Sequence, residues 1–456
     1  MDIPQPFPHQ IVGTQWLRNW DERALLLADT MGLGKTRQAC DAIGDRALVV
    51  CPPPLKHNWY DEIGKWRPDL KPVIMMGMHE VARFKWPSSG EVVIVGYNQV
   101  PDWMEQPRNV RKTDPNADKK RKANKAHRAE LKRQYRLVEK EGWADDLLLI
   151  ADEVQYVKNP KSSRARRFRT LSALCAYTRM LTGTPMPRGK PSDLYGILWA
   201  CVLENVVFHN LPHFETVSGI KGGVSPSKSF HTLLETHMLR RHKDEVAADL
   251  PPKLFRTVTV PLDRATNSKL EALNPELVAA IKRATTPAEL DKIRGMPGFA
   301  EFARTRQAIA HARIPGLMEH VQLAEENETP TLVFSAHRDP VLAFEGREGW
   351  AVIHGGVPLA ERQEIVRNQK QYKGIAITIK SGGAGLTLTH FSNVVFVDLD
   401  WDITWNEQAQ DRIHRYGQTA DFCVYTILTS DTAIDRLITE KLARAAFNID
   451  IVIEGK

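Results

Sequence analysis

The sequence DTMGLGKT at residues 29–36 lies between an apolar run, Ala24–Ala28, and a stretch with helical spacing, Lys35–Ile43. A glycine-rich turn that joins a buried strand to a helix is the setting in which backbone N–H groups and a helix N-terminus bind phosphate. A plain glycine turn before a surface helix would leave the same local pattern. The flanking strand and helix favour the phosphate-binding loop, and they indicate an α/β fold.

Four positions of this loop have an expected role in binding ATP. Gly32 and Gly34 would let backbone N–H groups approach the phosphates of ATP. Lys35 would reach the terminal phosphates, and the Thr36 hydroxyl would hold Mg²⁺. Asp29 stands where the strict pattern has glycine, so the match to the general motif is incomplete.

Short apolar runs recur along the chain in two series, which indicates two sheets. The expected strands are Ala24–Ala28, Ala47–Cys51, Val92–Val95 and Leu147–Ala151, and then Leu332–Phe334, Ala351–Ile353, Ile375–Ile379, Val394–Val397 and Cys423–Ile427. Continuously apolar strands of this length are typical of parallel sheets covered by helices on both faces. We therefore expect an α/β protein with two tandem lobes of parallel strands plus helical insertions.

The expected domains follow from these series. The first lobe would span residues 1–200, with a basic helical insertion at about 104–145. A helical linker region would span 201–327, and the second lobe, with a short C-terminal brace, 328–456.

A pair of carboxylates, Asp152 and Glu153, ends the run Leu147–Glu153 (LLLIADE). Asp152 would hold Mg²⁺, and Glu153 would orient and deprotonate an attacking water. The same residues could simply cap a helix. Their pairing with the loop at residues 29–36 favours the catalytic interpretation.

Two arginines near the C-terminus, Arg412 and Arg415, lie in the run Gln408–Gln418 (QAQDRIHRYGQ). Their spacing would place both on one face of a helix. Arginines that approach a transferring phosphoryl group stabilise its negative charge. A solvated helix face with no catalytic role fits the spacing equally well.

The net charge of +7 belongs to one segment. Residues 108–140 contain 13 Lys or Arg and 4 Asp or Glu, a net charge of +9, so the rest of the chain is slightly acidic. This segment is expected to be either a solvated helical hairpin or a nucleic-acid contact through Lys119, Lys120, Arg121 and Lys122.

No apolar stretch is long enough to cross a membrane, the N-terminus lacks a signal-peptide pattern, and the five cysteines are widely spaced. We expect no membrane contact and a cytoplasmic protein.

Taken together, the motifs resemble those of the Swi/Snf-type ATPases of helicase superfamily two, over nearly the whole chain. The resemblance rests on Gln10 and DTMGLGKT, on Cys51–Trp66 (CPPPLKHNWYDEIGKW), Asp152–Gln155 (DEVQ) and Leu181–Pro185 (LTGTP), and on Leu332–Ser335, Ser381–Leu388 (SGGAGLTL) and QAQDRIHRYGQ. The segments Val157–Ser163 (VKNPKSS) and Met238–Lys253 (MLRRHKDEVAADLPPK) are the most family-specific signals. Three positions depart from the family pattern: PFPHQ before and at Gln10, Gln155 in place of histidine, and Asp402-Ile403-Thr404 after Trp401.

The resemblance implies two recombinase-like lobes that bind ATP and Mg²⁺, and double-stranded DNA that is tracked without strand separation. It implies that Gln10 reads adenine and that position 155 couples the ATP site to LTGTP. The residues expected to bind nucleotide are Gln10, Asp29, Thr30, Met31, Gly32, Leu33, Gly34, Lys35, Thr36 and Gly385, with Lys35, Asp152, Glu153, Arg412 and Arg415 catalytic. The resemblance points to a minimal bacterial, archaeal or phage member, or to the annealing-helicase branch that acts on forked or branched DNA.

Contacts to DNA phosphates are expected from several segments, because a moving motor gains little from reading bases. The candidates, besides the basic segment, are Lys56, His57, Asn58, Lys158, Lys161, Thr182, Gly183, Ser381 and Gly382. We expect a monomer, and the sequence leaves the protein partners unknown. Two other functions stay open: a strand-separating DNA or RNA helicase, and a switch that binds ATP and DNA without hydrolysis.

Overall fold

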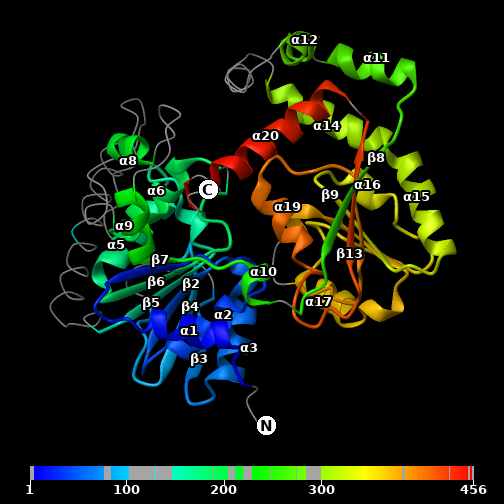
Figure 1. Ribbon diagram of the computed structural model, residues 1–456. Coiled ribbons are helices and arrows are strands. Elements are labelled where there is room, and N and C mark those ends of the chain that lie inside the picture. The colour runs from blue at the N-terminus through cyan, green and yellow to red at the C-terminus, as the bar shows by residue number, and fades with distance from the viewer. Residues whose placement is uncertain are drawn as a thin grey trace, which may run out of the picture. The chain divides into compact units, whose positions relative to one another are not determined.

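The computed structural model forms two compact units, which are described separately here (Figure 1). The first unit comprises Met1–Met186, Lys190–Val246 and Ile451–Lys456, and the second comprises Pro187–Gly189 and Ala247–Asp450. The structure describes residues 5–76, 84–101, 129, 146–187, 189–203, 211–218, 228–247, 249–273, 275–283, 299–382, 386–430, 432–449 and 452–453. Among these residues, no helix is both long and apolar enough to cross a membrane.

The first unit contains a sheet of seven parallel strands in the order β3-β4-β2-β5-β6-β1-β7. The strands are β1 (Ala24–Leu27), β2 (Ala47–Cys51), β3 (Lys71–Ile74), β4 (Glu91–Gly96), β5 (Leu148–Asp152), β6 (Tyr177–Leu181) and β7 (Met238–Leu239). Because all the strands are parallel, the carboxyl ends of β1, β5, β6 and β7 lie at one edge of the sheet. The loop after β1 and the carboxylates after β5 therefore share that edge.

Helices cover the first sheet. They are α1 (Pro8–Leu17), α2 (Lys35–Ala42), α3 (Lys56–Trp66), α5 (Ser163–Leu174), α6 (Pro191–Ala200), α8 (Leu211–Val217), α9 (Lys228–His237) and α10 (Lys243–Val246), with 3-10 turns η1 (Pro53–Leu55) and η3 (Val154–Val157). Leu17 of α1, Ala39 of α2 and Ile63 of α3 join one core cluster with Val49 and Ile150 of the strands. Helices α1, α2 and α3 thus cover the same face of the sheet.

The second unit contains six parallel strands in the order β10-β11-β9-β12-β13-β8. The strands are β8 (Lys253–Thr259), β9 (Thr331–Ser335), β10 (Trp350–Ile353), β11 (Gly374–Thr378), β12 (Asn393–Phe396) and β13 (Cys423–Thr429). Its helices are α11 (Arg264–Leu273), α12 (Pro275–Arg283), α14 (Phe299–Ala312), α15 (Ile314–Glu326), α16 (Asp339–Leu342), α17 (Leu359–Arg367), α18 (Ile379–Gly382), α19 (Ile403–Gln410) and α20 (Ala433–Ile449), with η4 (Gln369–Gln371). Two parallel sheets with helices confirm the expected fold class.

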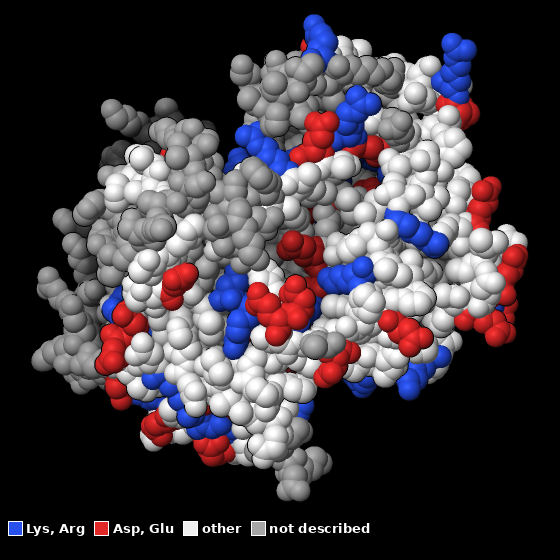
Figure 2. All heavy atoms as spheres, in the orientation of Figure 1, with Lys and Arg blue, Asp and Glu red and all other residues white. Residues whose placement is uncertain are grey.

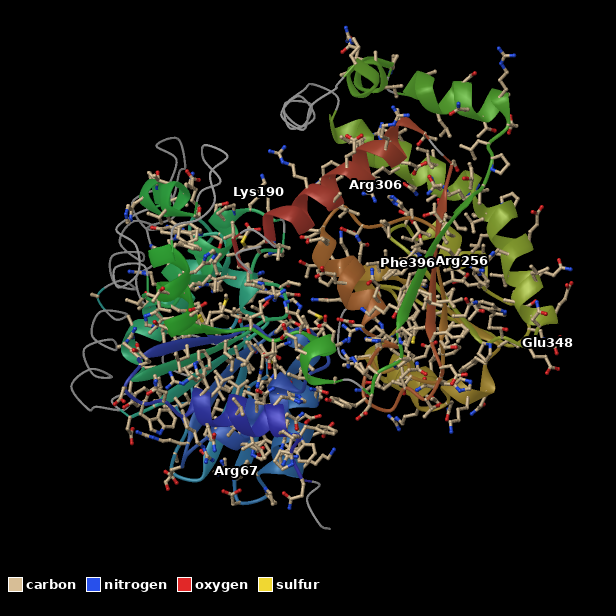
Figure 3. All side chains as sticks on the ribbon, viewed as in Figure 1. Arg67, Lys190, Arg256, Arg306, Glu348 and Phe396 are labelled. Atoms are coloured by element: carbon tan, nitrogen blue, oxygen red, sulfur yellow. The ribbon has the colours of Figure 1, made fainter. Side chains whose placement is uncertain are left out.

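Side-chain alternation divides the core of the second unit into two clusters. Phe334 of β9 stacks on Phe396 of β12 (Phe396 is labelled in Figure 3) with ring centroids 5.5 Å apart, in the cluster that includes α17 and α19. Val333 points to the opposite face and packs with Leu317 and Val321 of α15. This strand is buried on both faces, which explains its continuously apolar sequence.

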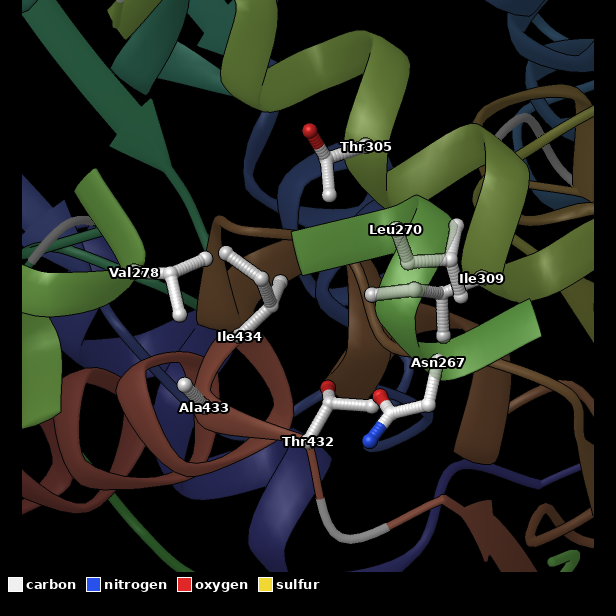
Figure 4. A pocket seen from close by; sticks show the side chains of 8 residues that line it. All are labelled: Asn267, Leu270, Val278, Thr305, Ile309, Thr432, Ala433 and Ile434. Carbon is white, nitrogen blue, oxygen red and sulfur yellow. The ribbon is translucent and has the colours of Figure 1, made fainter. Parts of the chain in front are cut away.

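The helices α11, α12, α14 and α20 pack around a further apolar cluster in the second unit. A small cavity remains among them (Figure 4), and it is lined by Asn267, Leu270, Val278, Thr305, Ile309, Thr432, Ala433 and Ile434. Most of this lining is apolar or short-chained, so the cavity is a packing feature of the helical cluster.

The strand β8 corrects one expectation. It lies inside residues 201–327, which we expected to be helical, and it pairs with β13 over its whole length, from Lys253 with Cys423 to Thr259 with Thr429. Leu254 and Phe255 are exposed on this edge strand, so its sequence lacks the apolar run that marks a buried strand. The domain boundaries otherwise stay a prediction.

The strand β6 was missed because of a buried charge. Arg179 is 1% exposed, and its guanidinium donates to backbone oxygens at and after the end of α1: Leu17 at 2.6 Å and Asn19 at 2.8 Å. A buried arginine is stable when carbonyl oxygens accept from its N–H groups.

The basic segment, including Lys119, Lys120, Arg121 and Lys122, lies outside the described residues apart from position 129.

Candidate functional site

The loop after β1 has the backbone shape of a phosphate-binding loop. Gly32 and Gly34 have φ angles of 87° and 74°, which residues with a Cβ rarely adopt. A Cβ on Gly34 would also overlap Nε2 of Gln10. The helix α2 begins directly afterwards at Lys35, so its first N–H groups open onto the loop.

The Lys35 ammonium lies back over the loop. Its Nζ donates to the backbone oxygens of Asp29 at 2.7 Å and Thr30 at 3.1 Å. Thr36 follows in the first turn of α2 and is half-buried. The loop thus combines one positive charge with helical N–H groups, and this combination suits a polyphosphate.

The residues at the start of α1 contact the same loop. Gln10 donates from Nε2 to the Leu33 oxygen at 3.4 Å and accepts from the Phe7 N–H at 3.1 Å. His9 places Nε2 at 3.1 Å from that same Leu33 oxygen. The structure therefore joins Gln10 to the loop, while its expected contact with adenine stays a prediction.

Asp152 ends β5, and aromatic residues fix its carboxylate and its backbone. Trp59 donates from Nε1 to Asp152 Oδ2 at 2.8 Å, and the Tyr97 hydroxyl donates to the Asp152 backbone oxygen at 2.8 Å. Desolvation, followed by the negative charge of Glu153, raises the pKa of Asp152, and the Lys35 ammonium opposes this rise. The loop and the carboxylate pair are thus close enough to act on each other.

Glu153 has a strained backbone, with φ and ψ both at 50°. Non-glycine residues in this left-handed region are uncommon and often mark functional sites. The Gln155 amide donates to the Glu153 carboxylate, and Thr182 donates from Oγ1 to Gln155 Oε1 at 2.7 Å. Position 155 therefore links Glu153 to the LTGTP segment, as the family resemblance implies.

The LTGTP segment also packs on the phosphate-binding loop. A Cβ on Gly183 would lie 2.6 Å from Met31 Cγ and 3.5 Å from the Lys35 ammonium. Both Met31 and Gly183 are buried. Glycine at this position lets the two segments approach closely.

In the second unit, Arg412 and Arg415 contact the segment after Ser381. Arg412 is 3% exposed and donates from Nη1 to the Leu386 oxygen at 3.3 Å. Arg415 donates to Thr387 Oγ1 at 3.3 Å and to the Asp411 oxygen at 2.8 Å. Gly385 lies outside the described residues.

One expectation about these arginines is wrong. The helix α19 ends at Gln410, and residues 411–417 form turns and bends, so Arg412 and Arg415 do not share a helix face. The Asp411 N–H still bonds to the Glu407 oxygen. The helical hydrogen bonding thus ends at Asp411, whose carboxylate pairs with Lys253 of β8 at 3.0 Å.

Three residues of the first unit that were expected to contact DNA are buried. Lys56 donates to the Met75 oxygen at 2.8 Å and to Gln99, and burial lowers its pKa. Thr182 is 1% exposed, and Gly183 is also buried. These three residues contact other residues inside the first unit and are not accessible to DNA. We therefore remove Lys56, Thr182 and Gly183 from the set of DNA contacts.

Five of the remaining candidates among the described residues are exposed or half-buried, and the sixth, Gly382, is buried. His57, Asn58 and Lys161 are exposed, whereas Lys158 and Ser381 are half-buried. Ser381 accepts from Thr378 Oγ1 at 2.8 Å. Gly382 is buried at the end of α18.

A run of basic residues follows Asp152–Gln155, and sequence reasoning singled out only Lys158 and Lys161 from it. Residues 154–192 contain nine Lys or Arg and no Asp or Glu, a signal that a count of charges along the chain would have found. On α5, Arg166 is exposed, and Arg164 donates to Asn98 Oδ1 at 3.1 Å. On the face in Figure 2, by contrast, acidic and basic side chains of the described residues are interspersed.

Models of two protein domain families match this chain. The SNF2-related domain matches residues 9–309, and the helicase conserved C-terminal domain matches residues 313–417. The DNA annealing helicase and endonuclease ZRANB3 of Mus musculus is 27% identical over 479 residues, which cover 98% of this chain and 41% of that protein. An uncharacterized ATP-dependent helicase of Mycoplasma pneumoniae is 24% identical over 461 residues, which cover 94% of this chain and 40% of that protein.

Among solved structures, the Sulfolobus solfataricus SWI2/SNF2 ATPase core in complex with dsDNA aligns over 99% of this chain and 95% of that chain. Its sequence identity is 20% and its TM-score is 0.41. The chain spans about two fifths of the length of the curated relatives it matches. Because the SNF2-related domain alone matches more than half of the chain, the chain belongs to the SNF2-related, Swi/Snf-type ATPase family of helicase superfamily two.

Proposed function

We propose that the chain hydrolyses ATP and uses the energy to move along double-stranded DNA, remodelling DNA or protein–DNA complexes without separating the strands. The observation that carries the hydrolytic part is the link from Glu153 through Gln155 to Thr182, beside the loop that holds Lys35. Family membership supports DNA as the track.

The roles proposed for the site follow its geometry. Lys35 and the N–H groups of the loop bind the β- and γ-phosphates, and Glu153 accepts a proton from the attacking water. The products are ADP and inorganic phosphate. Arg412 and Arg415 are the arginines that we propose stabilise the charge on the transferring phosphoryl group.

Mg²⁺ suits the oxygen ligands that Thr36 and Asp152 offer. Magnesium binds through one or two protein oxygens together with substrate phosphates. Desolvation and the adjacent Glu153 raise the pKa of Asp152, and a divalent cation would stabilise the charged form of this carboxylate. The cation, when bound, offsets the charge of the phosphates.

The indole of Trp59 is expected to orient the Mg²⁺ ligand, because its N–H binds Asp152 Oδ2 at 2.8 Å. Trp59→Phe keeps an aromatic ring in the buried site but removes this donor. Loss of a hydrogen bond that orients a metal ligand typically costs about 10–100-fold in metal affinity or activity. ATPase rates measured across a Mg²⁺ titration should show a rise of this size in the half-saturating concentration. Trp66→Phe, which removes an indole bound to Glu62, is the control, and equal Mg²⁺ curves for both variants would contradict the assignment.

DNA is proposed to contact the exposed cations Lys161 and Arg166, with His57 and Asn58. Each phosphate contact contributes about one unit to the slope of log affinity against log salt concentration. The double variant Lys161→Ala/Arg166→Ala should lower duplex affinity and reduce the slope by about two. Lys71→Ala, at the exposed start of β3, is the control. A slope equal to that of the wild type would remove Lys161 and Arg166 from the proposed DNA interface.

Two other functions predict different outcomes. A strand-separating helicase would be stimulated by single strands, and an RNA helicase by single-stranded RNA rather than duplex DNA. A non-hydrolysing switch would show no turnover at all. ATPase rates with duplex, forked, four-way and single-stranded DNA and with single-stranded RNA separate these possibilities, and they also show whether branched DNA is the preferred substrate.

A further inference from the structure

Two consecutive arginines after β7, Arg240 and Arg241, contact the segments that surround the nucleotide site. They belong to the run Met238–Lys253, whose sequence pattern indicates the family but not a chemical role. β7 pairs with β1 at the edge of the first sheet. The arginines therefore emerge beside the phosphate-binding loop.

Arg241 binds the one loop position that departs from the general motif. Its Nε donates to Asp29 Oδ1 at 3.0 Å and its Nη2 donates to Asp29 Oδ2 at 2.5 Å. Asp29 is fully buried, and the Arg241 side chain is 12% exposed. Such a two-pronged pair fixes both the position and the orientation of the carboxylate.

Further bonds extend this contact to neighbouring segments. Arg241 also donates to Gln38 Oε1 on α2 at 2.9 Å and to the His9 oxygen on α1. Gln38 in turn donates to Asp29 Oδ2 at 3.3 Å and to the Leu33 oxygen at 3.1 Å. Arg241 thus holds the start of the loop, the end of the loop and the helix that carries Gln10.

Arg240 and the backbone strengthen the same connection. Arg240 donates to the Ala28 oxygen at 3.0 Å and to the Gly183 oxygen at 3.4 Å. The Ala28 N–H bonds to the Leu239 oxygen at 2.7 Å, and the Thr30 N–H bonds to the Arg241 oxygen at 3.0 Å. The first residues of the loop therefore pair with residues 239–241 like an extension of the sheet.

These contacts lie shortly before the chain leaves the first unit. The main part of that unit ends at Val246, and the second unit continues from Ala247. We call residues 242–246 the connecting chain. It directly follows residues 239–241, which are bound to the phosphate-binding loop. A change in the loop's position on ATP binding would displace Arg241, and with it the start of the connecting chain.

We propose that Asp29 and Arg241 form a buried latch that positions the phosphate-binding loop and links its state to the chain connecting the two units. Arg241 is a positioning residue, because it acts through Asp29 and Gln38. This inference rests on the proposed ATPase function, since the latch matters only if the loop binds nucleotide. It also explains Asp29: the loop replaces glycine with a carboxylate because Arg241 is there to bind it.

The test compares four variants of the full chain. Arg241→Gln leaves the Asp29 carboxylate buried without its cation, which is strongly unfavourable. Asp29→Gly restores the general loop sequence, and the double variant Asp29→Gly/Arg241→Gln removes both charges. Arg67→Gln, which breaks the more exposed pair with Asp69 (Arg67 is labelled in Figure 3), is the control.

Affinity for a fluorescent ATP analogue should fall by up to about 100-fold in Arg241→Gln, because the loop loses its position. KM for ATP should rise more than kcat falls. The double variant should bind the analogue more tightly than Arg241→Gln, and Arg67→Gln should bind like the wild type. Wild-type affinity in Arg241→Gln, or no recovery in the double variant, would overturn the latch. If Arg241→Gln fails to fold, Arg241→Lys takes its place in the same comparison. Lysine keeps the positive charge but cannot form the two-pronged pair with Asp29.

Hydrogen exchange tests the link to the connecting chain. In the wild type, the ATP analogue should change amide exchange in residues 238–246, and this change should be smaller in the double variant, which keeps only the backbone and Arg240 contacts. If the ATP analogue does not change amide hydrogen exchange in residues 238–246 of the wild type, the proposed link is overturned. A double-mutant cycle of unfolding midpoints, measured without nucleotide, decides separately whether the two residues are coupled. A chain that binds no ATP would thus refute the proposed function while the cycle still tests the pair.

Discussion

Glu153→Gln should lower DNA-stimulated ATP turnover by about 10²–10⁴-fold, the contribution typical of a general base. Glutamine has the size of glutamate and an oxygen that can still accept from Gln155, whose amide donates to the Glu153 carboxylate. It cannot take a proton from water at neutral pH. The variant should therefore fold and bind ATP, and yet fail to hydrolyse it.

The measurement combines steady-state ATPase rates with equilibrium binding of a fluorescent ATP analogue. Lys35→Ala should lose both binding and turnover, because Nζ supplies the positive charge over the loop. Glu348→Gln, at an exposed carboxylate of the second unit (Figure 3), is the matched control and should change neither. Turnover in Glu153→Gln within a few-fold of the wild type would show that another group activates the water.

Gly196→Ala should destabilise the first unit by about 1–3 kcal/mol or more, the cost typical of overpacking. Gly196 lies on α6, which packs against the backbone that follows Asp152–Gln155. A Cβ at position 196 would overlap the Lys158 carbonyl oxygen and lie 2.6 Å from its carbonyl carbon. Because backbone cannot rotate away as a side chain can, the helix or the turn must shift.

The control is a second helical glycine with open surroundings. On α3, a Cβ added at Gly64 would have no neighbouring atom within 4 Å, so Gly64→Ala should stabilise the chain by about 0.4–1 kcal/mol. Thermal unfolding of the two variants beside the wild type should give midpoint shifts of opposite sign. A shift of the same sign and size in both would contradict the packing of α6 on Lys158.

Local sequence spacing was enough to place the loop and the carboxylates. Gly32, Gly34 and Lys35 lie within a few residues of each other in the sequence, and Asp152 ends a run of buried apolar residues. These features depend on neighbouring backbone, so a single stretch of sequence carries them. The parallel sheets were likewise predictable, because their central strands are apolar on both faces.

Contacts between distant segments could not be predicted in this way. The pairing of Asp29 with Arg241 and of Trp59 with Asp152 depends on which strands are neighbours in the sheet. Sequence spacing does not fix that order. The same limit explains Lys56, which looked like a surface cation until the fold placed Met75 and Gln99 around its ammonium.

Short or exposed strands also escape sequence reasoning. β7 has only two residues, and β8 exposes Leu254 and Phe255 at the sheet edge. Both strands are defined by their partners, β1 and β13, rather than by their own composition. The arginines after β7 were therefore interpreted as a family signal before their contacts with the loop were known.

The most direct test of the central proposal is displacement of a third strand from a DNA triplex, measured beside unwinding of an ordinary duplex. The wild-type chain should displace the third strand only with ATP and Mg²⁺, Glu153→Gln should not displace it, and neither protein should separate the duplex strands. ATP-driven duplex unwinding, or ATP turnover without any triplex displacement, would contradict the proposal that this chain is a double-stranded DNA translocase.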